Sequence, residues 1–364
     1  MARAASPPFR PTLPPQGRGR GARSNQTGRY EKDVREQIDD GWTDEMPPDP
    51  RTTVQLDPVR RIITYNESPY VGFDRSINPY RGCEHGCIYC FARPTHAYLG
   101  LSPGLDFETR LFARPGAADH LRRELSAARY KIAPIAIGTN TDPYQPVERK
   151  FRVMRSVLEV LSAFNHPVSV LTKSDLIMRD IDVLSGMAQR GLARAMVSVT
   201  TLDRRLARAM EPRCPRPDRR LLAIKALSEA GIPTGIMLGP MIPGLSDHEL
   251  DALMEEGRAH GAVYAAYTIL RLPQEVAPLF QEWLEAFAPN HARKVMNHIR
   301  EMNDGKIYDV NWSRAEGPRG AYAHLLKQRF DAAWRRHGYR EMPRLRTDRF
   351  AVPRAPSDQG DLFG

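Results

Sequence analysis

The sequence predicts an α/β fold in which parallel strands build a closed or partly closed barrel. Short apolar runs rich in Val, Ile and Thr begin at positions 134, 167, 194, 232 and 262, so their starts lie 33, 27, 38 and 30 residues apart. Helical patterns fill the intervals between these runs. Because a strand that follows a helical crossover lies parallel to the strand before it, this repeat is typical of strand-helix units.

Two earlier segments add strands to the series. One strand is expected in DFETRLFAR, residues 106–114, and another in the residues that lead into a cysteine cluster beginning at position 83. A series of this length favours a barrel over an open sheet. In such barrels the chemistry lies at the carboxyl ends of the strands, so the residues that end each apolar run are the first candidates for a functional site.

The intervals between the runs predict amphipathic helices. Residues 152–164 place apolar side chains on one helical stripe, which consists of Val153, Met154, Val157, Leu158 and Leu161. A second helix is expected to begin at Pro217 and to stop at Gly231. A third is expected to open with Ser246 and Glu249 at capping-box spacing and to close at Gly261.

Composition divides the chain into four parts. Residues 1–54 are rich in Pro, Gly and Arg and poor in apolar side chains, so they are expected to form a disordered basic arm. The barrel is expected over residues 55–275 and a helical extension over residues 276–342. Residues 343–364 are expected to form a flexible tail.

The formal net charge of +10 is concentrated near the two ends of the sequence. Residues 1–29 carry six arginines and no acidic residue, and residues 335–354 carry seven arginines against two acidic residues. The last ten residues contribute −2, which leaves about +1 for residues 30–334. Basic segments of this kind can attract a polyanion such as DNA, although solvated basic tails are also common.

Size and cysteine usage indicate a cytoplasmic protein without a membrane partner. The sequence contains no run of 18 apolar residues, and its amino end has no apolar region typical of a signal peptide. Three of the four cysteines lie within eight positions. In a reducing compartment, such a cluster more often binds a metal than forms disulfides.

The cluster is a CxxxCxxC motif, formed by Cys83, Cys87 and Cys90. One interpretation is a structural zinc ion with His85 or His96 as its fourth ligand. However, zinc sites usually combine two separate knuckles, and Cys214 lies more than a hundred residues away. Three thiolates without an evident fourth ligand suit a [4Fe-4S] cluster that leaves one iron open to an outside ligand.

With Tyr89 just before the third cysteine, the motif resembles the signature of the radical S-adenosylmethionine (SAM) enzymes. The resemblance implies a partial (β/α)6-type TIM barrel, here with a helical C-terminal extension, and a cluster in a loop at the barrel mouth. It implies that SAM chelates the open iron and that one electron cleaves it to methionine and a 5'-deoxyadenosyl radical. The electron would come from a donor such as flavodoxin or ferredoxin. Gly82 and Gly86 would let the loop wrap closely around the cluster.

Residues at three strand ends are candidates for SAM binding. Lys173 ends the run that starts at 167 and offers a point charge suited to a carboxylate, and Ser198 ends the next run. The chain is most similar to the spore photoproduct lyase branch in these two segments, and the resemblance implies that Lys173 and Ser198 contact SAM, with Tyr89 as an aromatic neighbour. Asn140 and Asp142 follow an earlier strand and are expected to face the same space.

The sequence departs from the lyase pattern at the residue that returns hydrogen to the product. The lyases use a cysteine near the position of Gly138 or Thr139 for this step, and that cysteine is absent here. The remaining candidates for a catalytic role are Cys214 and Tyr144. A free cysteine is, however, often only a small buried apolar residue.

The final residues, QGDLFG, resemble the short QxxLF peptide with which bacterial repair and replication proteins bind the sliding clamp. Gln359, Leu362 and Phe363 would make this contact, with the two apolar side chains entering a pocket of the clamp. The alternative is an ordinary polar tail that ends in two apolar residues.

The leading hypothesis is a radical SAM enzyme, of lyase type, that acts on DNA as in repair. A reacting base would then have to leave the duplex stack to reach the barrel mouth. A second hypothesis keeps the chemistry but assigns RNA, a peptide or a metabolite as the substrate. A third is a zinc-bound module without catalysis that binds nucleic acid or the clamp.

Overall fold

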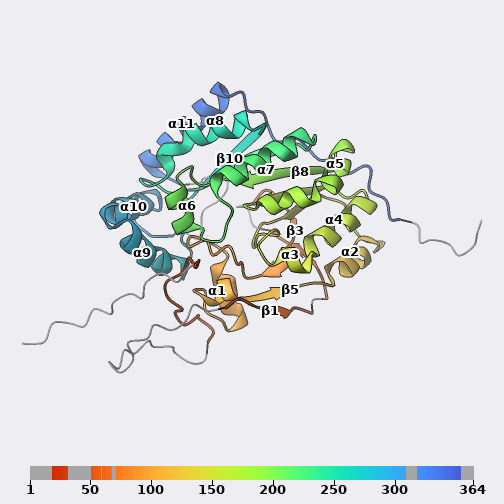
Figure 1. Cartoon of the computed structure of the whole chain (residues 1–364), viewed down its shortest axis with the longest axis horizontal. Coiled ribbons are helices and arrows are strands. Elements are labelled where there is room, and N and C mark those ends of the chain that lie inside the picture. The colour runs from red at the N-terminus through yellow and green to blue at the C-terminus, as the bar shows by residue number, and fades with distance from the viewer. Residues whose placement is uncertain (1–18, 32–50, 59, 68–70, 309–317, 354–364) are drawn as a thin grey trace, which may run out of the picture.

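The computed structural model describes residues 19–31, 51–58, 60–67, 71–308 and 318–353. Within these ranges, the larger sheet has the strand order β10-β9-β8-β7-β6-β3-β2, and each neighbouring pair is parallel except β2 with β3. The strands are β2 (Ile63–Tyr65), β3 (Arg75–Ile77), β6 (Ile135–Ile137), β7 (Val168–Thr172), β8 (Ala193–Ser198), β9 (Thr234–Met241) and β10 (Tyr264–Ile269). The six successive parallel strands of this sheet confirm the predicted partial barrel, which Figure 1 shows surrounded by helices.

Helices pack on the strands of this sheet and extend beyond its last strand. Those between the strands are α2 (Ala117–Leu125), α3 (Glu148–Phe151), α4 (Val153–Ala163), α5 (Ile181–Gln189), α6 (Arg204–Met210), α7 (Pro217–Glu229) and α8 (Leu250–Ala259). The C-terminal extension consists of α9 (Val276–Phe287), α10 (Pro289–Met302) and α11 (Gly320–Arg336). The five apolar positions of the predicted stripe on α4 are all buried. Among the described residues, none of the helices combines the length and apolarity that crossing a bilayer requires.

The predicted capping box before α8 is wrong. A short 3₁₀ turn (Asp247–Glu249) precedes the helix, and the Ser246 hydroxyl accepts a hydrogen bond from the Ile242 N–H at 3.0 Å. The Glu249 carboxylate instead accepts hydrogen bonds from the Thr201 hydroxyl and, at 3.1 Å, from the Leu202 N–H. These tertiary partners therefore replace the local capping contacts that the sequence spacing suggests.

A second, three-stranded sheet has the order β1-β5-β4. Its strands are β1 (Thr53–Leu56), β4 (Tyr80–Arg81) and β5 (Arg110–Ala113). The expectation that residues 106–114 add a strand to the barrel is therefore wrong: the first four form the short helix α1 (Asp106–Thr109), and β5 pairs outside the barrel. Because β4 leads directly to Cys83, this small sheet holds the entry to the cysteine motif.

The disorder expected for residues 1–54 is contradicted at residues 19–31, here called the N-terminal strap, and at the start of β1. In the strap, Ala22 is fully buried and Arg20 is 2% exposed. The N–H groups of Gly21 and Ala22 donate to the Glu108 carboxylate at 2.9 and 2.8 Å. The strap has few apolar side chains, and for that reason its composition predicted disorder. Charge-assisted hydrogen bonds to Glu108 instead offset the entropy lost on ordering it.

The flexible tail expected from residue 343 is also contradicted as far as residue 353. Backbone N–H groups of Arg340, Arg346 and Ala351 donate to carbonyls that precede β10, β8 and β7, at 2.9, 2.9 and 3.1 Å. The tail therefore runs along the amino ends of the barrel strands, opposite the ends at which the chemistry is expected. The predicted clamp-binding residues Gln359, Leu362 and Phe363 lie outside the described residues.

A buried histidine beneath this tail makes folding sensitive to acid. His166 is fully buried against the Phe350 ring, donates from Nδ1 to the Pro167 carbonyl at 3.0 Å and accepts at Nε2 from the Tyr130 hydroxyl at 2.7 Å. Burial lowers the pKa of His166 from 6.5 to about 4. The unfolded chain therefore takes up the proton first as the pH falls, and stability is lost between pH 6.5 and about 4.

We expect His166 to account for a loss of up to roughly 3 kcal/mol in the free energy of unfolding across that interval. Urea unfolding at a series of pH values should show this decline in the wild type. The variant His166→Asn should be less stable at neutral pH and should decline less steeply. A variant that declines as steeply as the wild type would contradict the assignment.

Candidate functional site

The three cysteines of the motif lie on the cysteine loop, residues 82–92, between β4 and a 3₁₀ helix, η1 (Arg93–Leu99). Cys83 and Cys87 are buried and Cys90 is half-buried. Gly82 and Gly86 have φ values of +73° and +68°, in the left-handed region that favours glycine. A Cβ atom on Gly82 would lie 2.7 Å from the Leu111 side chain, and one on Gly86 would lie 2.6 Å from the Glu108 carboxylate. Both glycines are therefore required by close packing of the loop on α1 and β5.

One buried arginine holds the backbone of this loop. Arg93 is fully buried and donates hydrogen bonds to the carbonyls of Cys87 and Gly86 at 3.0 and 3.1 Å. It donates further hydrogen bonds to two carbonyls of residues 103–104 and forms an ion pair with Glu108 at 2.5 Å. Since Glu108 also accepts the two N–H groups of the N-terminal strap, a single ion pair joins the strap, the cysteine loop and α1.

Residues 210–214, the MEPRC segment that follows α6, border the cysteine loop on another side. Pro212 disfavours helical backbone at the residue before it, and Glu211 accordingly leaves the helix. The segment lies along the cysteine loop, because the Ile88 N–H donates to the Met210 carbonyl at 2.9 Å and the Arg213 N–H donates to the His85 carbonyl at 3.3 Å. Arg213 also forms an ion pair with Glu84 at 2.6 Å.

The MEPRC segment brings Cys214 close to the CxxxCxxC motif. Its Sγ atom lies 3.8 Å from Sγ of Cys87, although the two residues are 127 positions apart. The structure therefore places Cys214 beside the cysteine loop. Hydrogen bonding from the Cys214 thiol lowers the pKa of Cys87. Whether Cys214 takes part in catalysis stays a prediction.

A buried polar network connects the MEPRC segment with the strand ends. Glu211 is 1% exposed and accepts hydrogen bonds from the Tyr89 hydroxyl, the Arg220 guanidinium and, at 2.7 Å, the Thr200 hydroxyl. Burial opposes ionisation of this carboxyl, but the charges of Arg220 and Lys173 lower the pKa of Glu211. The site therefore contains a buried carboxylate among cations.

Three of the predicted SAM-binding residues lie around the polar network of Glu211. Lys173 directly follows β7, and its Nζ atom lies 5.8 Å from the centroid of the Tyr89 ring. Burial disfavours the charge of Lys173, but the neighbouring Cys87 and Glu211 raise its pKa. Ser198, the last residue of β8, is 2% exposed and donates to the Gly239 carbonyl at 3.0 Å. Lys173 and Ser198 thus lie at the carboxyl ends of β7 and β8, near Tyr89 of the cysteine loop.

Asp142 is engaged inside the protein. Its carboxylate accepts hydrogen bonds from the Thr172 hydroxyl at 2.6 Å and from the N–H groups of Lys173 and Tyr144 at 2.7 and 2.9 Å. It also lies 3.4 Å from Nδ1 of His85. Despite the cost of burial, His85 and these donors lower the pKa of Asp142 to about 2. These partners indicate that Asp142 positions Lys173 and the cysteine loop, and the predicted contact between Asp142 and SAM stays a prediction.

Asn140 lies in the same loop after β6, and its N–H donates to the side-chain oxygen of Asn78 at 3.3 Å. This contact joins the loop to the residue that follows β3. The predicted contact between Asn140 and SAM stays a prediction.

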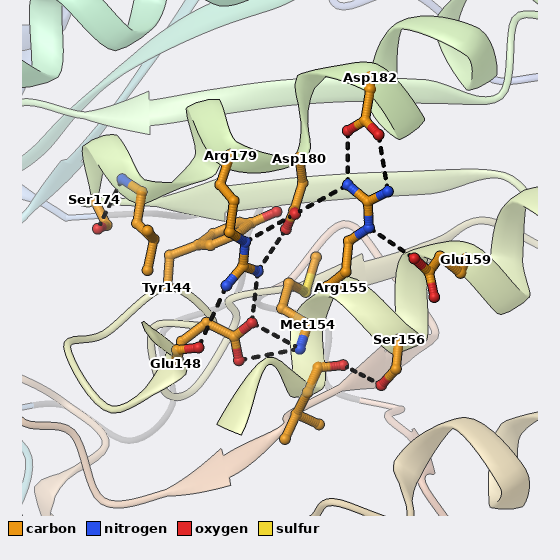
Figure 2. Close-up of polar contacts among 12 residues, drawn as sticks. Tyr144, Glu148, Met154, Arg155, Ser156, Glu159, Ser174, Arg179, Asp180 and Asp182 are labelled. Carbon is orange, nitrogen blue, oxygen red and sulfur yellow. Dashed lines mark hydrogen bonds and ion pairs between the residues drawn. The ribbon is translucent and has the colours of Figure 1, made fainter. Parts of the chain in front are cut away.

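Tyr144, the other candidate for a catalytic role, packs in the barrel core, and its role as a hydrogen donor stays a prediction. Tyr144 is 1% exposed and packs in the barrel core, whereas Cys87 and Tyr89 pack in a second apolar cluster with α9 and α10. Figure 2 shows Tyr144 beside Arg179 and Asp180, with Glu148 bound to the same arginine. Burial and the nearby Asp180 carboxylate raise the pKa of Tyr144 far above its ordinary value.

The two histidines considered as zinc ligands have other partners. His85 faces Asp142, and Nε2 of His96 donates to the Arg110 carbonyl at 2.9 Å. The His96 ring lies 5.2 Å from the Phe107 ring, and burial lowers its pKa to about 4. In the part of the chain that the structure describes, no three Cys, His, Asp or Glu side chains converge as they would around one metal ion.

Sequence reasoning missed four charged residues of this site, which are Arg93, Glu108, Glu211 and Arg220. Charged residues are rarely buried fully unless they are paired. A usable signal was the proline after Glu211, which predicts an extended residue directly behind α6. The pairing of Arg93 with Glu108 has no comparable signal in the sequence.

Comparisons with known proteins identify a family and similar chains. The family model described as the radical SAM superfamily matches residues 77–257. Uncharacterized proteins of Mycobacterium bovis and Mycobacterium tuberculosis are 37% identical over 232 residues, which cover 63% of this chain and 67% of theirs. An uncharacterized protein of Methanocaldococcus jannaschii is 26% identical over 184 residues, covering 50% of this chain and 66% of its own.

Among solved structures, a spore photoproduct lyase complexed with dinucleoside spore photoproduct is similar, with a TM-score of 0.54. The match covers 79% of this chain and 80% of the lyase at 15% sequence identity. At this identity the similarity concerns the fold.

Proposed function

Because the chain belongs to the radical SAM superfamily, we propose that it binds a [4Fe-4S] cluster through Cys83, Cys87 and Cys90 and cleaves SAM in a reaction on DNA. The observation that carries this proposal is that one loop contains the three cysteines and lies beside Lys173, at the carboxyl ends of the barrel strands. Thiolates are the usual ligands of iron-sulfur clusters, and a lysine suits the carboxylate of an amino acid.

The residues present fit these two groups. Arg93 and Glu108 hold the backbone of the cysteine loop, which contains the three thiols that would bind the cluster. When bound, the cluster would supply the electron that cleaves SAM to methionine and a 5'-deoxyadenosyl radical. Lys173 would hold the SAM carboxylate by charge, and Ser198 and Tyr89 would line the same space.

The protein also shields this chemistry. Strap residues Gly21 and Ala22 are buried against Glu108, and Tyr89 and Cys87 pack in an apolar cluster with Trp283 and other α9 residues. Excluding water strengthens the electrostatic contacts of a site and protects reactive intermediates from side reactions. Strap and α9 would therefore protect a radical from solvent.

DNA as the substrate class rests on the similar fold of the lyase that binds a dinucleoside photoproduct and on the six arginines of residues 1–29. The basic residues of the C-terminal tail lie at the opposite end of the barrel and would not contact a base at the mouth. A clamp contact through Gln359, Leu362 and Phe363, and an electron donor such as flavodoxin or ferredoxin, are further parts of this proposal.

A second candidate function is a zinc-bound module without catalysis. The proximity of Cys214 to Cys87 is the observation that favours it, because a structural zinc ion needs a fourth ligand besides the three thiols of the motif. The two candidates differ in the metal retained and in the number of cysteines required.

The proposal is tested by reconstituting the protein anaerobically with iron and sulfide, reducing it, and measuring 5'-deoxyadenosine formed from SAM. Ultraviolet-irradiated duplex DNA is expected to raise the rate over undamaged duplex, and a structured RNA serves as the matched polyanion. Equal rates with all three nucleic acids would contradict DNA lesions as the substrate. A protein that retains zinc and forms no deoxyadenosine would contradict radical chemistry altogether.

A further inference from the structure

Resting on the proposed function, we propose that Glu211 and Arg220 form a buried charge pair that sets the reduction potential of the cluster held by the cysteine loop. Both act as positioning residues through Tyr89, which lies between Cys87 and Cys90 in the sequence. The charge pair would thus determine how readily the cluster accepts the electron with which the reaction begins.

The contacts of the pair place its charges next to the cysteine loop. Arg220 is 1% exposed, donates to the Glu211 carboxylate and donates to the Ser198 carbonyl at 3.2 Å. Glu211 accepts the Tyr89 hydroxyl, and its own carbonyl accepts the Cys214 N–H at 3.0 Å. The Glu211 carboxylate therefore contacts the cysteine loop through Tyr89, and the Glu211 backbone contacts the backbone of Cys214.

Burial makes these charges effective. The attraction between two charges is several times stronger inside a protein than in water, and salt screens buried charges much less than exposed ones. A buried ion pair contributes little net stability compared with apolar residues of the same size. Its position beside the loop is thus better explained by the field it exerts there than by a contribution to folding.

The sign of each effect follows from the charge. Reduction adds an electron to the cluster, which the negative Glu211 disfavours and the positive Arg220 favours. Neutralising Glu211 should therefore make the potential more positive, and neutralising Arg220 should make it more negative. A purely structural disturbance would not produce shifts of opposite sign from two partners of one ion pair.

The chain offers a matched control in Glu148. This carboxylate is also fully buried and also accepts hydrogen bonds from a tyrosine, Tyr80, and an arginine, Arg179. It lies in the network of Figure 2, and its donor Tyr80 packs in the barrel core rather than in the apolar cluster that contains Cys87 and Tyr89. Glu148→Gln removes the same kind of charge at a different place.

The experiment is a spectroscopic redox titration of the reconstituted full-length chain and its variants. Glu211→Gln is expected to raise the equilibrium constant for reduction about tenfold, a shift of 59 mV for one electron, and Arg220→Gln to lower it. Glu211→Asp, which keeps the charge, and Glu148→Gln are expected to stay within about threefold of the wild type.

Shifts of the same sign in Glu211→Gln and Arg220→Gln, or no shift in either, would overturn the inference. Iron content and circular dichroism identify a variant that fails to fold. If Glu211→Gln or Arg220→Gln fails to fold, Glu211→Asp is compared with Glu148→Gln. A tenfold change in the equilibrium constant for reduction in Glu211→Asp, which keeps the charge, would contradict a charge effect. A wild-type protein that binds no cluster overturns the proposed function and this inference together.

Discussion

Replacing Cys87 with alanine is expected to reduce cluster iron and 5'-deoxyadenosine formation to background, whereas Cys214→Ala is expected to retain both near the wild-type level. The reason is that Cys83, Cys87 and Cys90 lie on one clamped loop, while Cys214 approaches them from the MEPRC segment. A cluster with one iron open to SAM needs three thiolates from the protein. Iron and sulfide per chain, the absorption spectrum and product formation measure the difference.

The same pair of variants separates the two candidate functions. A zinc site built from four thiolates would lose its metal in both variants, because structural zinc is almost always four-coordinate. Equal loss of metal in Cys87→Ala and Cys214→Ala, with zinc as the metal in the wild type, would therefore contradict the cluster. Because Cys214 is half-buried, its truncation removes few packing contacts and is a fair control for folding.

Glu108→Gln is expected to lower the free energy of unfolding by about 3–5 kcal/mol, because it leaves the fully buried Arg93 without its counter-charge. The same change weakens the two hydrogen bonds that hold Gly21 and Ala22 of the N-terminal strap. Denaturant unfolding measures the loss of stability. Limited trypsin digestion should show faster cleavage after Arg20, which is 2% exposed in the native protein.

The control for this prediction is Glu282→Gln on α9. Glu282 accepts hydrogen bonds from the side chains of Ser24 and Gln26, also in the strap, but in partly and fully exposed surroundings. Its replacement is expected to cost about 1 kcal/mol or less. Equal losses of stability in the two variants, or a strap that stays protected from trypsin in Glu108→Gln, would show that the Arg93–Glu108 pair does not hold the strap.

The cysteine variants and the Glu108 variant both test how the cysteine loop is held in place. The strap, the cysteine loop and the MEPRC segment come from three distant parts of the sequence, yet hydrogen bonds and ion pairs connect each of them to the next. A loop held from both sides would keep its three cysteines in place before the proposed cluster binds. Preorganisation of this kind lowers the cost of binding.

Much of the fold was predictable because its signals are local. The five apolar runs became β6 to β10, and the stripe on residues 152–164 became the buried face of α4. The periods of 2 and 3.6 residues reflect the geometry of the strand and the helix themselves, so a short window of residues contains them. The cysteine motif was readable for the same reason, since its three members share one loop.

The surroundings of that loop were not predictable, because contacts between distant residues depend on how the elements pack. Cys214, set aside as a zinc ligand because of its distance in the sequence, lies 3.8 Å from Cys87, and Asp142 positions the loop. An arm whose composition predicted disorder is ordered where Glu108 binds its backbone. Local periodicity thus determined the strands, the helices and the motif, while long-range pairing of buried charges, which leaves no period in the sequence, determined how the site is enclosed.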